Sequence, residues 1–267
     1  MILALAVKLI ATALVVIGVT LAVARVGPRL GGILAGTPII LGPGYFFMLQ
    51  ERPVDFVQSA ALSTLHALIA TLLFAGVFVL SAGRWGILVT LALATACWIP
   101  AAFAFAEMPG GVAGALVVYL LVLLAVEVLR RSLGLGAVAV KVRSGWWDLL
   151  LRGLLAGVLV SIATTVAARS GPLLSGVLVG FPVGLFTIGW TLYERYGADV
   201  ARATISLAQK GMLSLVAFAV TVSVTVQHLA PGWVFVAALS ASLAVSAGLY
   251  LASEWQYRQR LKTGVAP

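Results

Sequence analysis

Residues 24–38 read ARVGPRLGGILAGTP, and residues 168–182 read ARSGPLLSGVLVGFP. The two stretches align without a gap at an offset of 144 residues, with eight identical positions before a shared closing proline. With a one-residue shift, Glu51 and Arg52 fall on Glu194 and Arg195. Similarity of this density within one chain indicates an internal duplication. We therefore predict that one structural unit occurs twice.

The composition is typical of a protein that lies in lipid. The chain has 267 residues, of which 62% are hydrophobic and 9% charged, and its mean hydropathy is +1.14. Soluble domains carry about 25% charged residues. Many apolar runs reach the roughly 18–20 residues that a helix needs to cross a bilayer. This excludes a soluble globular protein and predicts an all-α polytopic membrane protein.

We predict nine transmembrane helices, arranged as two four-helix repeats around one connecting helix (4+1+4). Repeat 1 occupies residues 1–108, the connector with its basic loop residues 109–148, and repeat 2 with the C-terminal tail residues 149–267. The predicted spans are 3–25, 27–50, 57–80, 85–106, 111–129, 149–168, 171–192, 203–227 and 232–251.

The connecting span inverts the second repeat, because five crossings precede it. The positive-inside rule tests this arrangement independently. In the nine-span topology fourteen Lys and Arg residues lie on one face, and three, Lys8, Arg52 and Arg169, lie on the other. We therefore expect a multi-pass protein of the bacterial inner (plasma) membrane, with its N-terminus outside and its C-terminus in the cytoplasm.

Helices 2 and 7 are predicted to be discontinuous. Ten residues separate Pro28 from Pro38, and the same interval separates Pro172 from Pro182. Ten residues span about 15 Å of helix, half of the hydrocarbon core. Paired broken helices at matching positions of inverted repeats are typical of transporter binding sites. The predicted substrate-binding residues at the breaks are Gly36, Thr37, Pro38, Gly180, Phe181 and Pro182.

Ionisable residues within the spans give further candidates, because buried charge in a membrane usually marks function. His66 and Lys210 are 144 residues apart and therefore occupy the same repeat position. We predict that both bind substrate. The alternative is that His66 packs against a neighbouring helix and that Lys210 lies nearer the membrane surface.

Charged residues near the span ends are candidates for gating or coupling. Arg25 and Arg169 each precede a Gly-Pro pair, and the alternative is that they only satisfy helix carbonyls. Glu51 and Glu194 are the acidic candidates, and the alternative is an ion pair with the adjacent arginine.

Other charged residues at the span ends are given structural roles. Lys8 and Arg152 correspond at the offset of 144 residues, and we expect their side chains to extend to the lipid headgroups. Asp55 and Asp199 are expected to be helix N-caps.

Residues 175–205 resemble the small four-span bacterial inner-membrane proteins of the GlpM type, whose chains carry AG, FP, ER and RAT in similar order. In this sequence the corresponding residues are Gly176, Phe181-Pro182, Glu194-Arg195 and Arg202-Ala203-Thr204. The first half departs from the pattern, since Thr37 replaces the phenylalanine and RAT is missing at 58–60. The resemblance implies a four-span unit, here duplicated and inverted, and it implies nothing about the substrate.

The leading functional hypothesis is a secondary transporter or flippase-like carrier of an anionic substrate, working by alternating access. The substrate would be a small organic anion, phosphate or a phosphorylated lipid headgroup. The alternatives are a non-transporting subunit of an envelope-assembly complex and a membrane-embedded lipid enzyme. The sequence has no nucleophile, nucleotide-binding or metal-ligand motif, so we expect no enzyme activity, cofactor or metal. The expected partners are membrane lipids and a second copy of the chain, and no nucleic acid.

Overall fold

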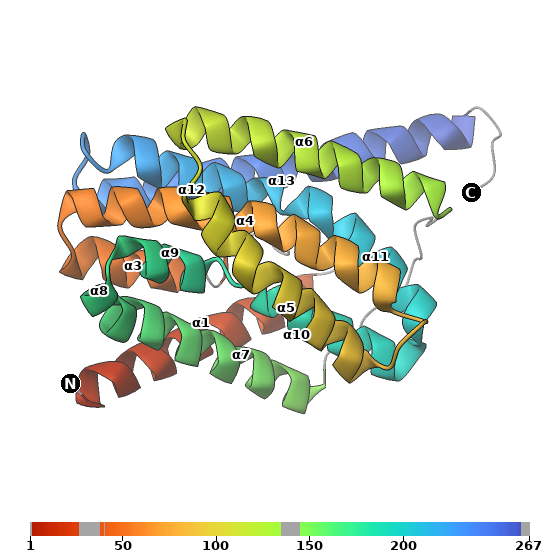
Figure 1. Ribbon diagram of the computed structural model, residues 1–267, viewed down its shortest axis with the longest axis horizontal. Helices are drawn as coiled ribbons and strands as arrows, with labels where there is room; N and C mark the ends of the chain where they lie inside the picture. Colours follow the sequence, from red (N-terminus) through yellow and green to blue (C-terminus); the bar gives the residue numbers. More distant parts are fainter. Residues whose placement is uncertain (1, 27–37, 40, 135–144, 263–267) are drawn as a thin grey trace.

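A computed structural model describes residues 2–26, 38–39, 41–134 and 145–262 (Figure 1). These residues form helices, and the β-structure among them is a single bridge between Ala82 and Trp85. Six helical segments of the described chain are long and apolar enough to cross a membrane. They are Val54–Ser81, Ile87–Ala106, Gly111–Ser132, Pro172–Tyr196, Ala198–Thr225 and Pro231–Trp255. The prediction of an all-α membrane protein is confirmed.

Several helix bounds lie close to the predicted spans, whereas α13 (Pro231–Lys262) extends beyond the end expected at residue 251. For example, the span expected at 85–106 is the helix Ile87–Ala106. The elements in chain order are α1 (Ile2–Val26), α3 (Leu41–Glu51), α4 (Val54–Ser81), α5 (Ile87–Ala106), α6 (Gly111–Ser132), α7 (Trp146–Ser161), the π-helix η1 (Ile162–Val166), α8 (Ala167–Ser170), α9 (Pro172–Val179), α10 (Val183–Tyr196), α11 (Ala198–Gly211), α12 (Leu213–Thr225) and α13 (Pro231–Lys262).

Helix α4 is the centre of the bundle. It packs against α5, α6, α9, α11 and α12, and 83% of its most apolar 18-residue window is buried. The corresponding value for α6 is 17%, so α6 lies at the periphery, as Figure 1 shows. The buried polar residues of α4 are therefore held inside protein rather than in lipid.

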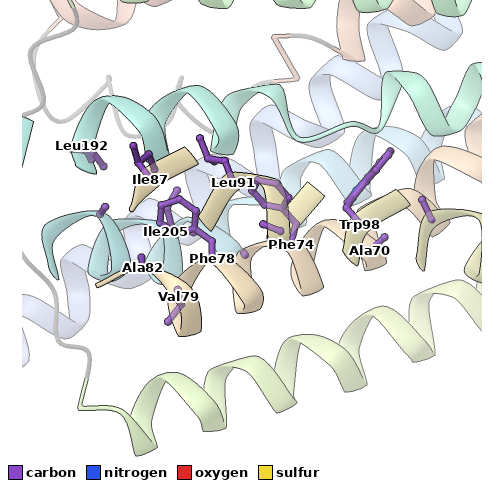
Figure 2. Close-up of a cluster of buried hydrophobic side chains, with 14 of the residues drawn as sticks. Ala70, Phe74, Phe78, Val79, Ala82, Ile87, Leu91, Trp98, Leu192 and Ile205 are labelled. Atoms are coloured by element: carbon purple, nitrogen blue, oxygen red, sulfur yellow. The ribbon is translucent and has the colours of Figure 1, made fainter. Parts of the chain in front are cut away.

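An apolar cluster joins α4 and α5 to the second half of the chain. Phe74 and Phe78 of α4 and Leu91 of α5 meet Leu192 of α10 and Ile205 of α11 (Figure 2). All five side chains are at least 98% buried. Lipid is as apolar as these side chains, so close packing rather than transfer from water holds α10 and α11 against α4 and α5.

Glycines allow two helix pairs to approach closely. A Cβ built at Gly157 of α7 would lie 2.6 Å from the carbonyl oxygen of Leu9 in α1, and one at Gly153 would lie 3.2 Å from that of Ala13. A Cβ at Gly176 of α9 would collide with backbone of α4 and lie 2.8 Å from the Cβ of Ser63. Small residues at such spacing let membrane helices pack backbone to backbone.

Candidate functional site

The helix formed by α9 and α10 is interrupted where the sequence predicts. Helix α9 ends at Val179 and α10 begins at Val183, with Gly180, Phe181 and Pro182 between them. Pro182 has no backbone N–H to donate, which prevents a regular continuation of α9. Gly180 packs closely on α4, since a Cβ at this position would lie 2.6 Å from the Cβ of Ala67.

Side chains of α4 approach carbonyl groups at the end of α9, including that of Gly176, which also accepts from the backbone N–H of Gly180 at 3.0 Å. Thr64 Oγ1 donates to the carbonyl oxygen of Gly176 at 2.8 Å, and Thr71 Oγ1 lies 3.4 Å from that of Gly180. The indole Nε1 of Trp98 in turn donates to Thr71 Oγ1 at 3.0 Å. Non-helical backbone inside a membrane is tolerated only where protein or water satisfies it, and here α4 and α5 supply the partners.

Phe181 extends from the interruption into an aromatic contact. Its ring lies 5.0 Å from that of Trp98, centroid to centroid, at an interplanar angle of 85°. Edge-to-face pairs of this kind contribute about 0.5–1.5 kcal/mol beyond area burial. The predicted substrate residue Phe181 therefore packs against another aromatic side chain of the bundle.

The first predicted break lies only partly within the described residues. Gly36 and Thr37 lie outside them, whereas Pro38 is described and buried. Three residues later α3 begins at Leu41. A Cβ built at Gly44 of α3 would lie 3.2 Å from the side chain of Val179, the last residue of α9. The helical segments next to the two predicted breaks therefore contact each other inside the bundle.

His66 is buried in the middle of α4 with 1% exposure. Neither ring nitrogen has a hydrogen-bond partner among the described residues. Its chain neighbours Leu65 and Ala67 belong to two apolar clusters. An unpaired buried imidazole is costly, so its retention favours a role that apolar packing would not require.

Lys210 lies near the C-terminal end of α11, and its side chain is 52% exposed. Its Nζ is 3.5 Å from Oε1 of Glu127 in α6, which also pairs with Arg130 and Arg131. No hydrogen bond or ion pair recorded for the described residues joins Lys210 to His66. The two positions, which the sequence predicts to correspond, thus have different surroundings.

A second polar site lies where α1, α3 and η1 meet, and we call it the polar cluster: Lys8, Glu51, Arg52, Thr164 and Thr165. Lys8 Nζ donates to Glu51 Oε2 at 2.5 Å and to Thr165 Oγ1 at 3.4 Å. Arg52 Nη2 donates to the carbonyl oxygen of Thr164 at 3.1 Å. A π-helix leaves backbone groups displaced from regular pairing and often marks a functional position.

The polar cluster corrects two expectations. Lys8 is 4% exposed, so its side chain does not extend to the headgroups. Glu51 pairs with Lys8 across two helices rather than with its neighbour Arg52. The physical reason is that Lys8 faces α3, where a carboxylate offers a stronger partner than the interface does.

The remaining candidates lie at helix ends. Arg169 is exposed in the last turn of α8, and Glu194 is exposed near the end of α10. The side chain of Arg25 lies outside the described residues. Asp55 and Asp199 are in the first turns of α4 and α11, but the N-caps are Pro53 and Gly197, so the capping prediction is wrong by two residues. The carboxylates still lie where the helix dipole favours them.

Sequence reasoning missed three features of these sites. It did not identify Thr64 and Thr71 as partners of the broken helix, nor the π-helix Ile162–Val166. The sequence did offer a signal at Lys8 and Arg152, which correspond at the offset of 144 residues. Both contact protein, since Arg152 Nε donates to Thr187 Oγ1 of α10 at 3.2 Å. Among the described residues, no group of three His, Cys, Asp or Glu side chains is placed to hold a metal ion.

Comparison with protein-family models, curated proteins and solved structures finds no match.

Proposed function

We propose that the chain is a membrane carrier that moves an anionic substrate by alternating access between two inverted four-helix repeats. The observation that carries this proposal is the interruption between Val179 and Val183, inside the bundle and against the central helix. Broken helices that meet inside a bundle are the usual construction of secondary-transporter sites. The proposal keeps the predicted nine spans, with the N-terminus outside and the C-terminus in the cytoplasm.

The packing of the helices supports the proposed repeats. At the offset of 144 residues α1 corresponds to α7, and these two helices pack on each other. Helix α4 packs on α5, and correspondingly α12 packs on α13; α5 contacts α10, and correspondingly α13 contacts α3. In Figure 1 α4 runs antiparallel to its counterpart, the α11–α12 segment. Inverted repeats predict this relation between corresponding helices.

The two basic residues at corresponding positions also support the repeats. Lys8 of α1 contacts Glu51 of α3, and Arg152 of α7 contacts Thr187 of α10. Helices α3 and α10 are the segments that follow the breaks in each repeat. A basic side chain from the first helix of each repeat thus contacts the segment after the break, at the last residue of α3 in one repeat and near the start of α10 in the other.

The negative charge proposed for the substrate is supported by the electrostatics at the two ends of the broken helix. The carbonyl groups near the C-terminus of α9 are covered by Thr64 and Thr71. At the start of α10 the N–H of Val183 donates to the carbonyl oxygen of Phe181 at 2.8 Å, and the helix dipole places partial positive charge at this end. Together with the basic Arg152 on the adjacent α7, this end of α10 favours an anion.

Transport assays in proteoliposomes test the proposal. One assay measures uptake of radiolabelled phosphate, and the other measures translocation of fluorescent phosphatidylglycerol by accessibility to dithionite. The variant Pro182→Ala removes the residue that interrupts the helix, and we expect transport to fall at least about tenfold if the break is required, as for misplaced site geometry. Pro231→Ala, at the first position of α13, is the matched control and should leave transport unchanged.

Two results would contradict the carrier proposal. One is normal transport by Pro182→Ala in a correctly folded protein. The other is absence of transport of either probe by the unmodified protein, together with stable co-purification of an envelope protein. The second result would favour the alternative of a non-transporting subunit.

A further inference from the structure

An apolar groove lies between α1, α3 and α13 and is not part of the interruption described above. Its volume is about 560 Å³, within the range of small-molecule sites. Thr12 of α1, Pro38 and Phe47 of the first broken helix, and Phe235 and Leu243 of α13 lie on its walls. The groove therefore contacts the first predicted break at Pro38.

The groove opens toward the side of the bundle. Val15 and Phe46 on its walls are 45% and 47% exposed, and on apolar helices of a membrane protein such residues face lipid. Phe235 and Leu243 are eight residues apart along α13, which gives about 12 Å of helix. An apolar chain that enters from the bilayer fits this lining.

One end of the groove is polar. Lys8 is one helical turn from Thr12, and its Nζ lies 5.6 Å from the centre of the Phe47 ring. Thr12 is fully buried, and its hydroxyl has no hydrogen-bond partner among the described residues. The Nε of Arg52 in the polar cluster is also buried without a partner. Unpaired buried donors are costly, and an additional acceptor group would satisfy them.

The polar cluster beside this end carries net positive charge, because it contains Lys8 and Arg52 and one carboxylate, that of Glu51, which pairs with Lys8. In the proposed topology this end faces the outside, where the chain has only three basic residues. The positive-inside rule therefore does not account for Lys8 and Arg52. Their position beside an apolar groove indicates a ligand with an anionic head and an apolar tail.

We propose that the groove binds one acyl chain of an anionic phospholipid, with the headgroup phosphate at Arg52 and Lys8. This inference rests on the proposed function in one respect, namely that the bound lipid would be the substrate that the carrier transports. Binding of the lipid does not depend on transport.

Photocrosslinking tests the occupancy of the groove. The full chain is reconstituted in nanodiscs with phosphatidylglycerol that carries a diazirine in one acyl chain, and the labelled peptides are identified by mass spectrometry. We expect labelling of the α1 and α13 segments that contain Val15 and Leu239. Gly42 lies on the groove wall, and a Cβ there would meet no atom within 4 Å. Gly42→Leu should therefore fill the groove and reduce this labelling about tenfold, as overpacking of an occupied site does.

Two further variants keep the test independent of folding. Gly248 of α13 is exposed, has no atom within 4 Å of a built Cβ and is not on the groove wall, so Gly248→Leu is the matched control and should not change labelling. Leu239→Trp fills the groove from the opposite wall and should act like Gly42→Leu. All variants are first compared by size-exclusion chromatography.

The headgroup is tested with Arg52→Gln. The unmodified protein should prefer phosphatidylglycerol over phosphatidylcholine bearing the same diazirine chain, and the variant should lose about tenfold of that preference, as expected for a hydrogen bond to a charged group. Equal labelling by the two lipids, or labelling of the groove that persists in both folded filling variants, would overturn the inference. Labelling of the groove without lipid translocation or phosphate uptake would support the lipid site and contradict the carrier proposal. Uptake of phosphate without labelling of the groove would support the carrier proposal and contradict the lipid site.

Discussion

Replacement of the two partners of the Lys8–Glu51 ion pair should have unequal effects on stability. The side chain of Lys8 is 5% exposed, and that of Glu51 is 41% exposed. Glu51→Gln leaves an ammonium buried, with Thr165 Oγ1 at 3.4 Å and the Phe47 ring as its remaining contacts. Loss of one partner from a buried pair costs about 3–5 kcal/mol. Since these contacts remain, we expect about 2–3 kcal/mol.

Lys8→Met should cost less, because Glu51 can turn toward water. We expect about 1 kcal/mol, near the upper value for an exposed ion pair. The double variant removes both charges and leaves no buried ion, so it should be more stable than Glu51→Gln alone. A double-mutant cycle of unfolding free energies, measured by SDS titration in mixed micelles, should give a coupling of about 1–2 kcal/mol.

The matched control is Arg131→Met, which removes a 72% exposed partner of Glu127. Its effect should stay within about 0.5 kcal/mol. Equal costs for the two single variants would contradict the reasoning from burial. A coupling below about 0.5 kcal/mol would show that the two side chains do not act as a pair.

The remaining predictions concern the central helix and the interruption. Gly176→Ala should destabilise the bundle by about 1–3 kcal/mol in the same SDS titration, because the added Cβ collides with α4. The control is Gly76→Ala, whose added Cβ would meet no atom within 4 Å; it should be neutral or stabilise the protein by up to about 1 kcal/mol. Thr71→Val should cost about 1–3 kcal/mol, because it leaves the indole N–H of Trp98 buried without an acceptor; an unchanged unfolding free energy would show that the bond contributes nothing. His66→Leu should leave stability unchanged or raise it, since both ring nitrogens are unpaired. Loss of transport in a stable His66→Leu protein would assign His66 to the carrier, and normal transport would leave it a packing residue.

Much of the helical architecture could be predicted because helix length in a membrane is set by bilayer thickness. The window at 111–129 corresponds to α6 at Gly111–Ser132, and the break at Gly180 to Pro182 lies where proline chemistry requires it. Both predictions depend on local properties of the chain. They need no knowledge of which helix contacts which.

The position of each helix in the bundle could not be predicted in the same way. The most apolar 18-residue window of α6 is more apolar than that of α4, yet 83% of the α4 window is buried and 17% of the α6 window. Lipid and protein interior are both apolar, so hydropathy does not distinguish them. The better signal is the polar content of α4, where Thr64, His66 and Thr71 are buried.

Side-chain partners across the bundle were the least predictable part of the candidate site. Lys8 and Glu51 are 43 residues apart, and Lys8 and Thr165 are 157 residues apart. Their meeting depends on the angle at which α1 crosses α3 and η1, which no sequence period encodes. Residues near a span end thus need a tertiary structure before they can be assigned to lipid or to protein.

The glycine contacts fix two helix pairs of the bundle against sliding of one helix along the other. Helices α1 and α7 interlock through backbone at Gly153 and Gly157, and α9 is fastened to α4 in the same manner at Gly176. Neither pair can slide along its contact, since a shift would bring backbone carbonyl oxygens of one helix into the backbone of the other. Each pair is therefore expected to behave as one rigid unit. The Lys8–Glu51 pair joins α1, in the first of these units, to α3, which belongs to neither, so a displacement of α1 relative to α3 would have to separate the ammonium from its carboxylate.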